Sequence, residues 1–176
     1  MPGRFDLTGL LEAYVPHAGE ERAYAEMLIR MRSSADVLSR YEFSPGHFTT
    51  SGFVVSPGGR LLLIFHNRLG KWLQPGGHIE LEDTDFCASA QREITEETGL
   101  DNLDAIGDGI FDVDVHDIPA FRDEPPHTHF DLRFLFGAAG QPTAGDGVGS
   151  VAWVAPAKVA SYTDDRSVRR AVAKLS

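Results

Sequence analysis

The sequence contains a single cysteine and no long apolar run. Cys87 is the only cysteine among 176 residues, so no internal disulfide can form and a reducing cytoplasm is the expected location. No apolar stretch approaches the roughly 20 residues that a membrane-spanning helix needs. The opening MPGRFDLTGLLEAY lacks a basic segment followed by an apolar one, so no signal peptide is expected.

Basic residues are also scarce. The chain carries 16 Lys and Arg against 26 Asp and Glu, a formal net charge of −10. Nucleic acids and anionic membranes need clustered Lys and Arg, so neither is an expected partner. A small anionic substrate is still compatible, because a bound divalent cation can reverse the local field. The length and the 42% hydrophobic content fit one globular domain with its own core.

The pattern of apolar residues changes near residue 45. Residues 1–45 carry two apolar series at helical spacing, which predict a helical N-terminal extension. These are Leu7, Leu10, Leu11 and Tyr14, followed by Tyr24, Met27, Leu28 and Met31. Residues 46–176 are expected to form the main domain.

Strands and helices alternate irregularly in this second part. Segments 47–56, 60–66, 110–116, 127–136 and 148–154 have strand-like composition. Between them stand a Gly-Pro loop (KWLQPGGH), a helix at about 85–98 and a helix within 164–175, whose basic residues are expected to face solvent. This order predicts an α/β or α+β fold in a layered sandwich.

The segment REITEETGL concentrates negative charge on one helix face. Glu93, Glu96 and Glu97 fall within an arc of roughly 100°. They precede Gly99, the expected C-cap, where carboxylates are disfavoured by the helix dipole and by one another. One interpretation is a solvated acidic face in which Arg92 pairs with Glu96. The other is a set of oxygen ligands for a hard divalent cation such as Mg²⁺.

The preceding residues favour the second interpretation. Gly76 and Gly77 form a tight loop that can bring a backbone carbonyl of either residue to a metal. The stretch GGHIELEDTDFCASAQREITEETGL resembles the signature of the Nudix hydrolases, G-x5-E-x7-R-E-U-x-E-E-x-G-U, in which U is aliphatic. Every specified position of the second half is matched, from Arg92 to Leu100.

The first half of the motif departs from that signature by one extra residue. Counted forward from the glycine, the first glutamate of the pattern falls on Asp83, and counted back from the arginine it falls on Thr84. Asp83 and Glu82 are both candidates for the missing carboxylate, with Asp83 preferred. Asp83, Thr84 and Asp85 are alternatively N-caps of the helix.

The resemblance implies a fold, an activity and a cofactor. The family fold is an α/β/α sandwich with a mixed sheet. Its members cleave nucleoside diphosphates linked to another moiety, by attack of water on phosphorus, with Mg²⁺ or Mn²⁺; homodimers are possible. The arginine of the motif orients the first glutamate by a salt bridge. The matching positions are Arg92, Glu93, Glu96 and Glu97 for catalysis, and Gly77, Asp83, Glu93, Glu96 and Glu97 for metal binding.

Two other activities of the same fold are alternatives to the hydrolase. A prenyl-diphosphate isomerase would use a cysteine on a loop distinct from the motif helix, and Cys87 lies on that helix. A non-catalytic module that senses a nucleotide is kept open by the extra residue in the motif. The intact glutamates favour the hydrolase.

HTHFDLRFLF suggests a second functional stretch. On a strand, His127, His129, Asp131 and Arg133 share one face, opposite an apolar one. That face is either a solvent-facing polar edge or a wall of the catalytic cleft that contacts phosphate or a water-bridged metal. The stretch also resembles the H-x-H-x-D-H motif of metallo-β-lactamase-like enzymes. Leu132 replaces the last histidine and no histidine follows, so that fold is rejected.

Two further residues are predicted to contact the substrate. His78 directly follows Gly77 and is placed to meet a phosphate, with a surface position as the alternative. Trp72 is a candidate to stack on a base, with packing as the alternative.

Overall fold

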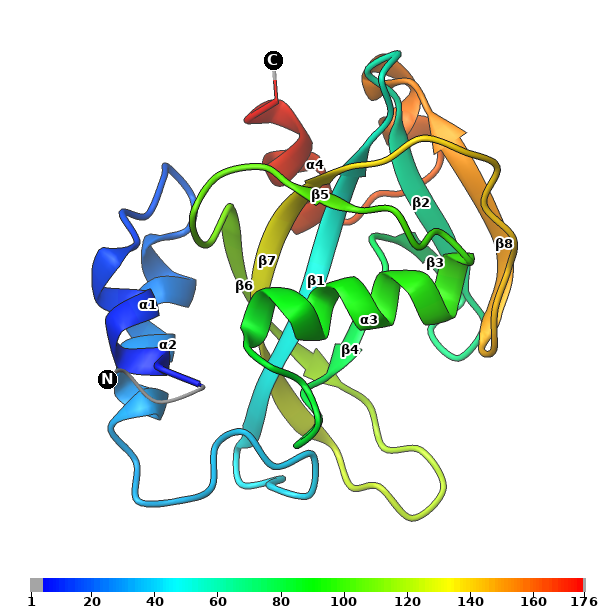
Figure 1. Ribbon diagram of the computed structural model, residues 1–176. Coiled ribbons are helices and arrows are strands. Elements are labelled where there is room, and N and C mark those ends of the chain that lie inside the picture. Colours follow the sequence, from blue (N-terminus) through cyan, green and yellow to red (C-terminus); the bar gives the residue numbers. More distant parts are fainter. Residues whose placement is uncertain (1–4, 176) are drawn as a thin grey trace.

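The computed structural model describes residues 5–175, which contain four α-helices, a short 3-10 helix and one eight-stranded mixed sheet (Figure 1). The helices are α1 (Leu7–Ala13), α2 (Glu21–Met31), α3 (Phe86–Thr98), η1 (Pro156–Ser161) and α4 (Arg166–Ala173). The strands are β1 (Gly46–Val55), β2 (Leu61–His66), β3 (Lys71–Leu73), β4 (Gly76–His78), β5 (Asp104–Ala105), β6 (Asp112–Ile118), β7 (His127–Gly137) and β8 (Val148–Val154).

The central strand β1 runs parallel to β7 along its full length, from Gly46 opposite Thr128 to Val55 opposite Gly137. It is antiparallel to β2 and β4, while β6 and β5 add to β7 and β8 adds to β2. Successive side chains of a strand point to opposite faces. Each long strand therefore contributes to two different layers of the molecule.

Helices cover both faces of the sheet. On one face α3 crosses β1 (Figure 1), so closely that a Cβ on Gly52 would lie 2.5 Å from Cδ1 of Ile94. On the other face α4 packs Val168 and Ala171 against Phe53, and all three are fully buried. The predicted α/β/α sandwich with a mixed sheet is confirmed.

The N-terminal helices share their core with the sheet. Leu11 of α1 and Met27 of α2 are fully buried in the cluster that contains Phe48 of β1. The helical prediction for 1–45 is correct over α1 and α2, but residues 32–45 are not helical, and residues 1–4 lie outside the described part. Just after α2, Oγ of Ser33 accepts from the backbone N–H of Ala35. Such a local side-chain contact competes with continuation of the helix. The boundary after residue 45 stays a prediction.

The predicted Gly-Pro loop contains two short strands, β3 and β4. Gly76 pairs with Ser51 and Gly77 with Thr50. A Cβ on Gly76 would lie 2.3 Å from Cβ of Ser51, so the glycine permits a close approach of two strands. The expectation of a tight loop at Gly76 and Gly77 was wrong, because both glycines lie in β4, which pairs with β1.

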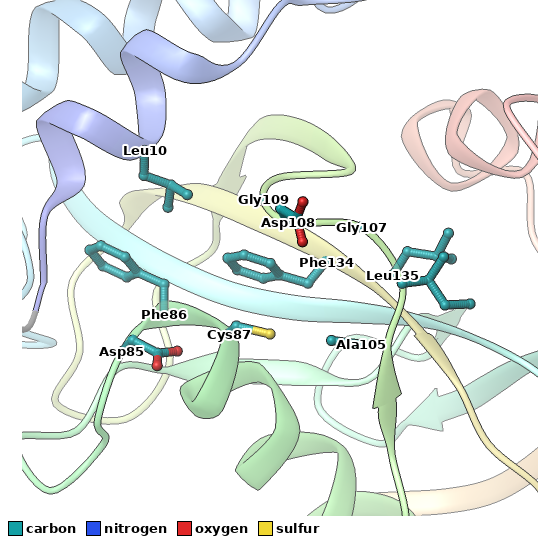
Figure 2. A pocket seen from close by; sticks show the side chains of 11 residues that line it. Leu10, Asp85, Phe86, Cys87, Ala105, Gly107, Asp108, Gly109, Phe134 and Leu135 are labelled. Carbon is teal, nitrogen blue, oxygen red and sulfur yellow. The ribbon is translucent and has the colours of Figure 1, made fainter.

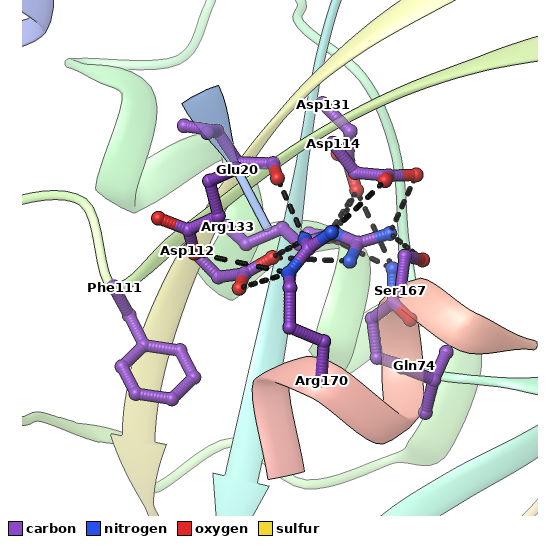
Figure 3. A network of polar contacts seen from close by, with 12 residues as sticks. Glu20, Gln74, Phe111, Asp112, Asp114, Asp131, Arg133, Ser167 and Arg170 are labelled. Atoms are coloured by element: carbon purple, nitrogen blue, oxygen red, sulfur yellow. Dashed lines mark hydrogen bonds and ion pairs between the residues drawn. The ribbon is translucent and has the colours of Figure 1, made fainter. Parts of the chain in front are cut away.

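The basic residues of α4 do not all face solvent. Arg166 and Arg169 are exposed. Nη2 of Arg170, however, donates to Oδ1 of Asp112 at 2.7 Å, as Figure 3 shows. Nζ of Lys174 donates to Oδ2 of the same aspartate at 3.0 Å and also contacts Glu20 at the start of α2. Part of the predicted solvated face therefore joins α4 to β6 and to the N-terminal helices.

Candidate active site

The helix that carries the glutamates begins and ends by local rules. Asp85 is its N-cap, and Oδ1 accepts from the backbone N–H of Ala88 at 2.8 Å. Gly99 is its C-cap with φ +69°, and its N–H donates to the carbonyl of Thr95 at 2.8 Å. Ile94 and its apolar neighbours face the sheet. The glutamates therefore lie off the apolar face, toward β4.

Strand β4 contacts two of the glutamates directly. The backbone N–H of Gly76 donates to Oε2 of Glu97 at 2.9 Å. A Cβ on Gly77 would lie 2.5 Å from Oε2 of Glu93, so a side chain at this position would displace that carboxylate. Pairing of β4 with β1 thus holds both glycines against α3. Together these residues form the glutamate site, which consists of Gly76, Gly77, Glu93, Glu96 and Glu97.

Arg92 joins the loop before α3 to the glutamates. Its Nε and Nη2 donate to the two oxygens of Asp83 at 2.8 and 3.1 Å, a forked contact. Its Nη1 donates to Glu93 at 2.9 Å and to Glu96 at 3.3 Å. The extra loop residue therefore leaves a carboxylate, that of Asp83, in contact with the arginine. The buried Asp83 also accepts from the backbone N–H of Glu80 at 2.9 Å.

Burial destabilises the negative charge of two glutamates. It raises the pKa of Glu97 to about 7; the hydrogen bond from Gly76 opposes this shift, and the charges of Glu93 and Glu96 add to it. Burial also raises the pKa of Glu93, against the favourable charge of Arg92. The protein's own cations therefore neutralise these carboxylates incompletely.

A hard divalent cation fits this site. Carboxylate and carbonyl oxygens are the ligands that Mg²⁺ and Mn²⁺ prefer, and one or two carboxylates with waters and substrate oxygens usually suffice. The missing side chain of Gly77 lets the carboxylate of Glu93 lie directly against β4. The donor set and the poorly neutralised carboxylates both suit such an ion.

The second predicted stretch, on β7, is interior to the sheet. β7 lies between β1 on one side and β6 on the other, and Asp131 and Arg133 are 3% and 2% exposed. The alternative of a solvent-facing edge is therefore wrong. Oδ2 of Asp131 accepts from Ser51 at 2.7 Å and from Arg133 at 2.9 Å, so its carboxylate is held by the surrounding strands.

Arg133 forms the centre of a buried ionic network (Figure 3). Besides Asp131, it donates to Asp112 and Asp114 of β6, each at 3.2 Å, and to Ser167 of α4 at 3.0 Å. Burial opposes the charge of the guanidinium, but the three carboxylates raise the pKa of Arg133 above its usual range. The network joins β6, β7 and α4 and fixes the strand face on which the histidines lie.

The remaining predicted contacts lie in two places. His78, His127 and His129 come together, with ring centroids 5.0 Å apart for His127 and His129 and 5.5 Å apart for His78 and His129. Trp72 on β3 packs edge-on against Phe65 and Tyr162 instead. The structure therefore groups three of the predicted substrate residues beside β4 and sets Trp72 apart from them.

Two further histidines join this group: sequence reasoning missed His47 and did not connect His116 with His129. His47 of β1 lies opposite His129 in the parallel pairing, and His116 of β6 lies opposite the same residue in the antiparallel pairing. Neither belongs to a motif. Only the partner choice and register of the strands bring them to His129, and no spacing within the sequence encodes that arrangement.

A cavity of about 320 Å³ lies away from the glutamate site, between α1, the start of α3 and residues 105–109 (Figure 2). Its walls include Leu10, Phe86, Cys87 and Phe134, and none of the motif glutamates. Burial, with the nearby charge of Asp85, raises the pKa of the Cys87 thiol to about 11. The cysteine is therefore a half-buried neutral thiol, which is a poor nucleophile.

The sheet, the two helical layers and the joined glycine–glutamate elements define an α/β domain with a carboxylate-rich site. The sequence profile of the NUDIX domain matches residues 46–175. The chain belongs to the Nudix family, whose hydrolases act on phosphoric anhydride bonds.

Individual proteins are similar to this chain in sequence or in fold. The chain is 28% identical over 132 residues to the "Probable DHNTP pyrophosphohydrolase" of Lactococcus lactis subsp. cremoris, covering 74% of this chain and 76% of that protein. The MutT protein from Methanosarcina mazei Go1 superposes with a TM-score of 0.58 at 16% identity, over 73% of this chain and 91% of that one. A Nudix hydrolase from Clostridium perfringens gives 0.56 at 20% identity, over 79% and 100%.

The lengths and compositions of the helices were compared with those of membrane-spanning helices. Within residues 5–175, none of them is both long enough and apolar enough to cross a bilayer.

Proposed function

We propose that this Nudix hydrolase is a divalent-metal-dependent pyrophosphohydrolase. The observation that carries the proposal is the direct contact of β4 with Glu93 and Glu97, which holds two poorly neutralised carboxylates against one short strand. Mg²⁺ or Mn²⁺, when bound, neutralises phosphate charge and lowers the pKa of an attacking water. Glu93, Glu96 and Glu97 would hold the ion. Arg92 keeps Glu93 in position through its contact at 2.9 Å.

The substrate is a compound that contains a phosphoric anhydride. Water adds to one phosphorus, the bond from that phosphorus to the bridging oxygen breaks, and the leaving phosphate keeps this oxygen. With a triphosphate ester the products are a monophosphate ester and diphosphate. DHNTP is the first candidate, because the Lactococcus relative is named a probable DHNTP pyrophosphohydrolase. Nucleoside diphosphates linked to another moiety are the second class.

The predicted substrate contacts differ in how well their positions support them. His78 follows Gly77 on β4, and the rings of His127 and His129 lie near it, so a contact of these three residues with substrate is supported by the position of His78 in the chain beside Gly77. Contact of substrate with Asp131 or Trp72 stays a prediction, since both side chains are already engaged with protein neighbours.

A panel of phosphoric anhydrides tests the proposal. The purified protein with Mg²⁺ or Mn²⁺ would be incubated with DHNTP, nucleoside triphosphates, ADP-ribose, NADH, sugar nucleotides, dinucleoside polyphosphates and prenyl diphosphates. Products resolved by mass in ¹⁸O-labelled water would identify the phosphorus attacked. We expect Glu96→Gln to lower turnover by at least about 100-fold. Glu12→Gln, at an exposed carboxylate of α1, is the matched control and should leave it unchanged.

The same panel separates the alternatives. Binding of an anhydride without turnover by the wild type would replace the hydrolase with a nucleotide-sensing module. Rearrangement of a prenyl diphosphate without hydrolysis would indicate the isomerase, which the high pKa of the Cys87 thiol disfavours. Cytoplasmic location is proposed from the single cysteine. Homodimer formation stays a prediction.

A further inference from the structure

Five of the seven histidines gather on one face of the sheet. This histidine cluster consists of His47 of β1, His78 of β4, His116 of β6, and His127 and His129 of β7. Strand register produces it: His47 and His116 both lie opposite His129, and His78 lies opposite Thr49, two residues along β1 from His47. The cluster is therefore built from four strands.

Three of these side chains converge. One ring nitrogen each from His47, His78 and His129 lies within 4.8 Å of the other two. A tetrahedral ion about 2.0–2.1 Å from each nitrogen would separate such nitrogens by about 3.4 Å, so small side-chain rotations suffice. Within residues 5–175, no other set of three His, Cys, Asp or Glu side chains brings its ligand atoms as close. The motif glutamates are not such a set.

His47 presents an unpaired nitrogen to this group. The residue is fully buried, and Nδ1 lies 3.0 Å from the carbonyl oxygen of Glu42. A carbonyl oxygen can only accept, so Nδ1 carries the proton and Nε2 keeps a lone pair. Nε2 has no hydrogen-bond partner in the part of the chain that the structure describes. Buried polar atoms without a partner are rare, and a histidine anchored to a carbonyl through its other nitrogen is typical of metal ligands.

Neighbouring histidines are anchored in the same way. Nδ1 of His127 lies 2.8 Å from the carbonyl oxygen of Pro125, which leaves a lone pair on its Nε2. That atom lies 3.1 Å from Nε2 of His129 and holds the ring of His129 in place. Nδ1 of His116 lies 3.0 Å from Oδ2 of Asp114. The contacts of His127 and His116 therefore fix the orientation of the rings next to His129.

We propose that His47, His78 and His129 bind a transition-metal ion such as Zn²⁺ at a site distinct from the glutamate site. Imidazole nitrogens suit Zn²⁺, Cu²⁺ and Ni²⁺, whereas Mg²⁺ and Mn²⁺ prefer the oxygens of the glutamates. Three protein ligands leave a coordination position open, as in catalytic zinc sites. The open position can take a water or a phosphate oxygen.

Cobalt spectroscopy tests the site without measuring turnover. Metal-stripped protein would be titrated with Co²⁺ in excess Mg²⁺ and followed by visible absorption. We expect one equivalent of Co²⁺ with the intense bands of four-coordinate nitrogen ligation, displaced by Zn²⁺. Glu96→Gln should retain these bands, which separates this result from failure of the hydrolase proposal.

Variants identify the ligands. His129→Ala and His78→Ala should each lose the intense bands, and His127→Ala should weaken Co²⁺ binding about 10–100-fold through the lost support of His129. His17→Ala, at an exposed histidine, is the matched control and should bind like the wild type. Circular dichroism checks that each variant is folded, and a variant of His78, on the short β4, serves if His129→Ala unfolds.

The opposite spectrum would overturn the proposal. Only weak six-coordinate bands in the wild type, or intense bands that persist in both His78→Ala and His129→Ala, would show that the triad does not bind the ion. Bands that vanish in Glu96→Gln while the histidine variants keep them would assign the metal to the glutamate site instead.

Discussion

Asp131 and Arg133 stand two residues apart on β7 and bond to each other at 2.9 Å, with both side chains almost completely buried. An ion pair on the inside of a sheet needs further partners, because removing two charges from water costs more than one contact returns. Asp112 and Asp114 on the neighbouring strand and Ser167 on α4 are those partners. One arginine therefore links β6, β7 and the more distant α4.

Removal of this arginine should destabilise the fold severely. Arg133→Met leaves the buried carboxylate of Asp131 without its cation and removes one cation from Asp112 and Asp114, and we expect the free energy of unfolding to fall by about 3–5 kcal/mol. Urea denaturation followed by circular dichroism measures the change. Arg22→Met, which breaks the exposed pair with Glu26, is the matched control and should have little effect. Equal losses for the two variants would contradict a structural role of the network.

The contact between Gly77 and Glu93 predicts a defect in activity. In Gly77→Ala the added Cβ would lie only 2.5 Å from Oε2 of Glu93, which is too close for a contact, so the carboxylate should move. A displacement of this size should lower kcat by about 10²-fold. Steady-state kinetics on the substrate found by the panel would measure it. Gly58→Ala, where the nearest atom to the added Cβ is 3.9 Å away, is the control, and an unaffected Gly77→Ala enzyme would exclude the contact from catalysis.

The extra residue before α3 left two candidates for the first carboxylate of the motif. Asp83 is buried and bonded to Arg92, whereas Glu82 is exposed. We expect Asp83→Asn to weaken the hold on Arg92, to lower kcat and to raise the Mg²⁺ concentration needed for half-maximal rate. Glu82→Gln should leave both unchanged. The reverse pattern in a Mg²⁺ titration of the two variants would assign the role to Glu82.

The raised pKa of Glu97 predicts how the stability of the metal-free protein depends on pH. The folded protein keeps this proton up to about pH 7, while the unfolded chain releases it near its usual pKa of 4.5. The stability that the protonated Glu97 contributes to the folded state is therefore fully present below pH 4.5. It is lost as the pH rises through about 7, because the buried carboxylate then ionises. It amounts to at most about 3 kcal/mol.

Urea denaturation in chelator at pH 5 and pH 8 measures this loss. Glu97→Gln, which cannot ionise, should be more stable than the wild type at pH 8 and show a smaller difference between the two pH values. Mg²⁺ should restore stability to the wild type at pH 8, because the bound ion favours the ionised carboxylate. A Glu97→Gln protein with an unchanged pH dependence would contradict the assignment.

The helix α3 shows how much of the site followed from local sequence. Its start at Asp85, its end at Gly99 and the common face of its glutamates depend on capping and on a repeat of 3.6 residues. The pairing of Arg92 with Asp83 did not follow from the motif, because the inserted residue left it ambiguous which position corresponds to the first glutamate. Only the folded loop placed Asp83 beside the guanidinium.

The sequence by itself determined the helices, most strands and the glutamate motif, since each depends on residues within a few positions of one another. The tertiary structure alone decided that Gly76 pairs with Ser51, that Arg170 and Lys174 turn inward to Asp112, and that His47 meets His129. These contacts join residues 25–82 positions apart. The choice of strand partner, register and buried charge is a property of the whole chain, because only packing of the complete sheet decides which side chains lose contact with water.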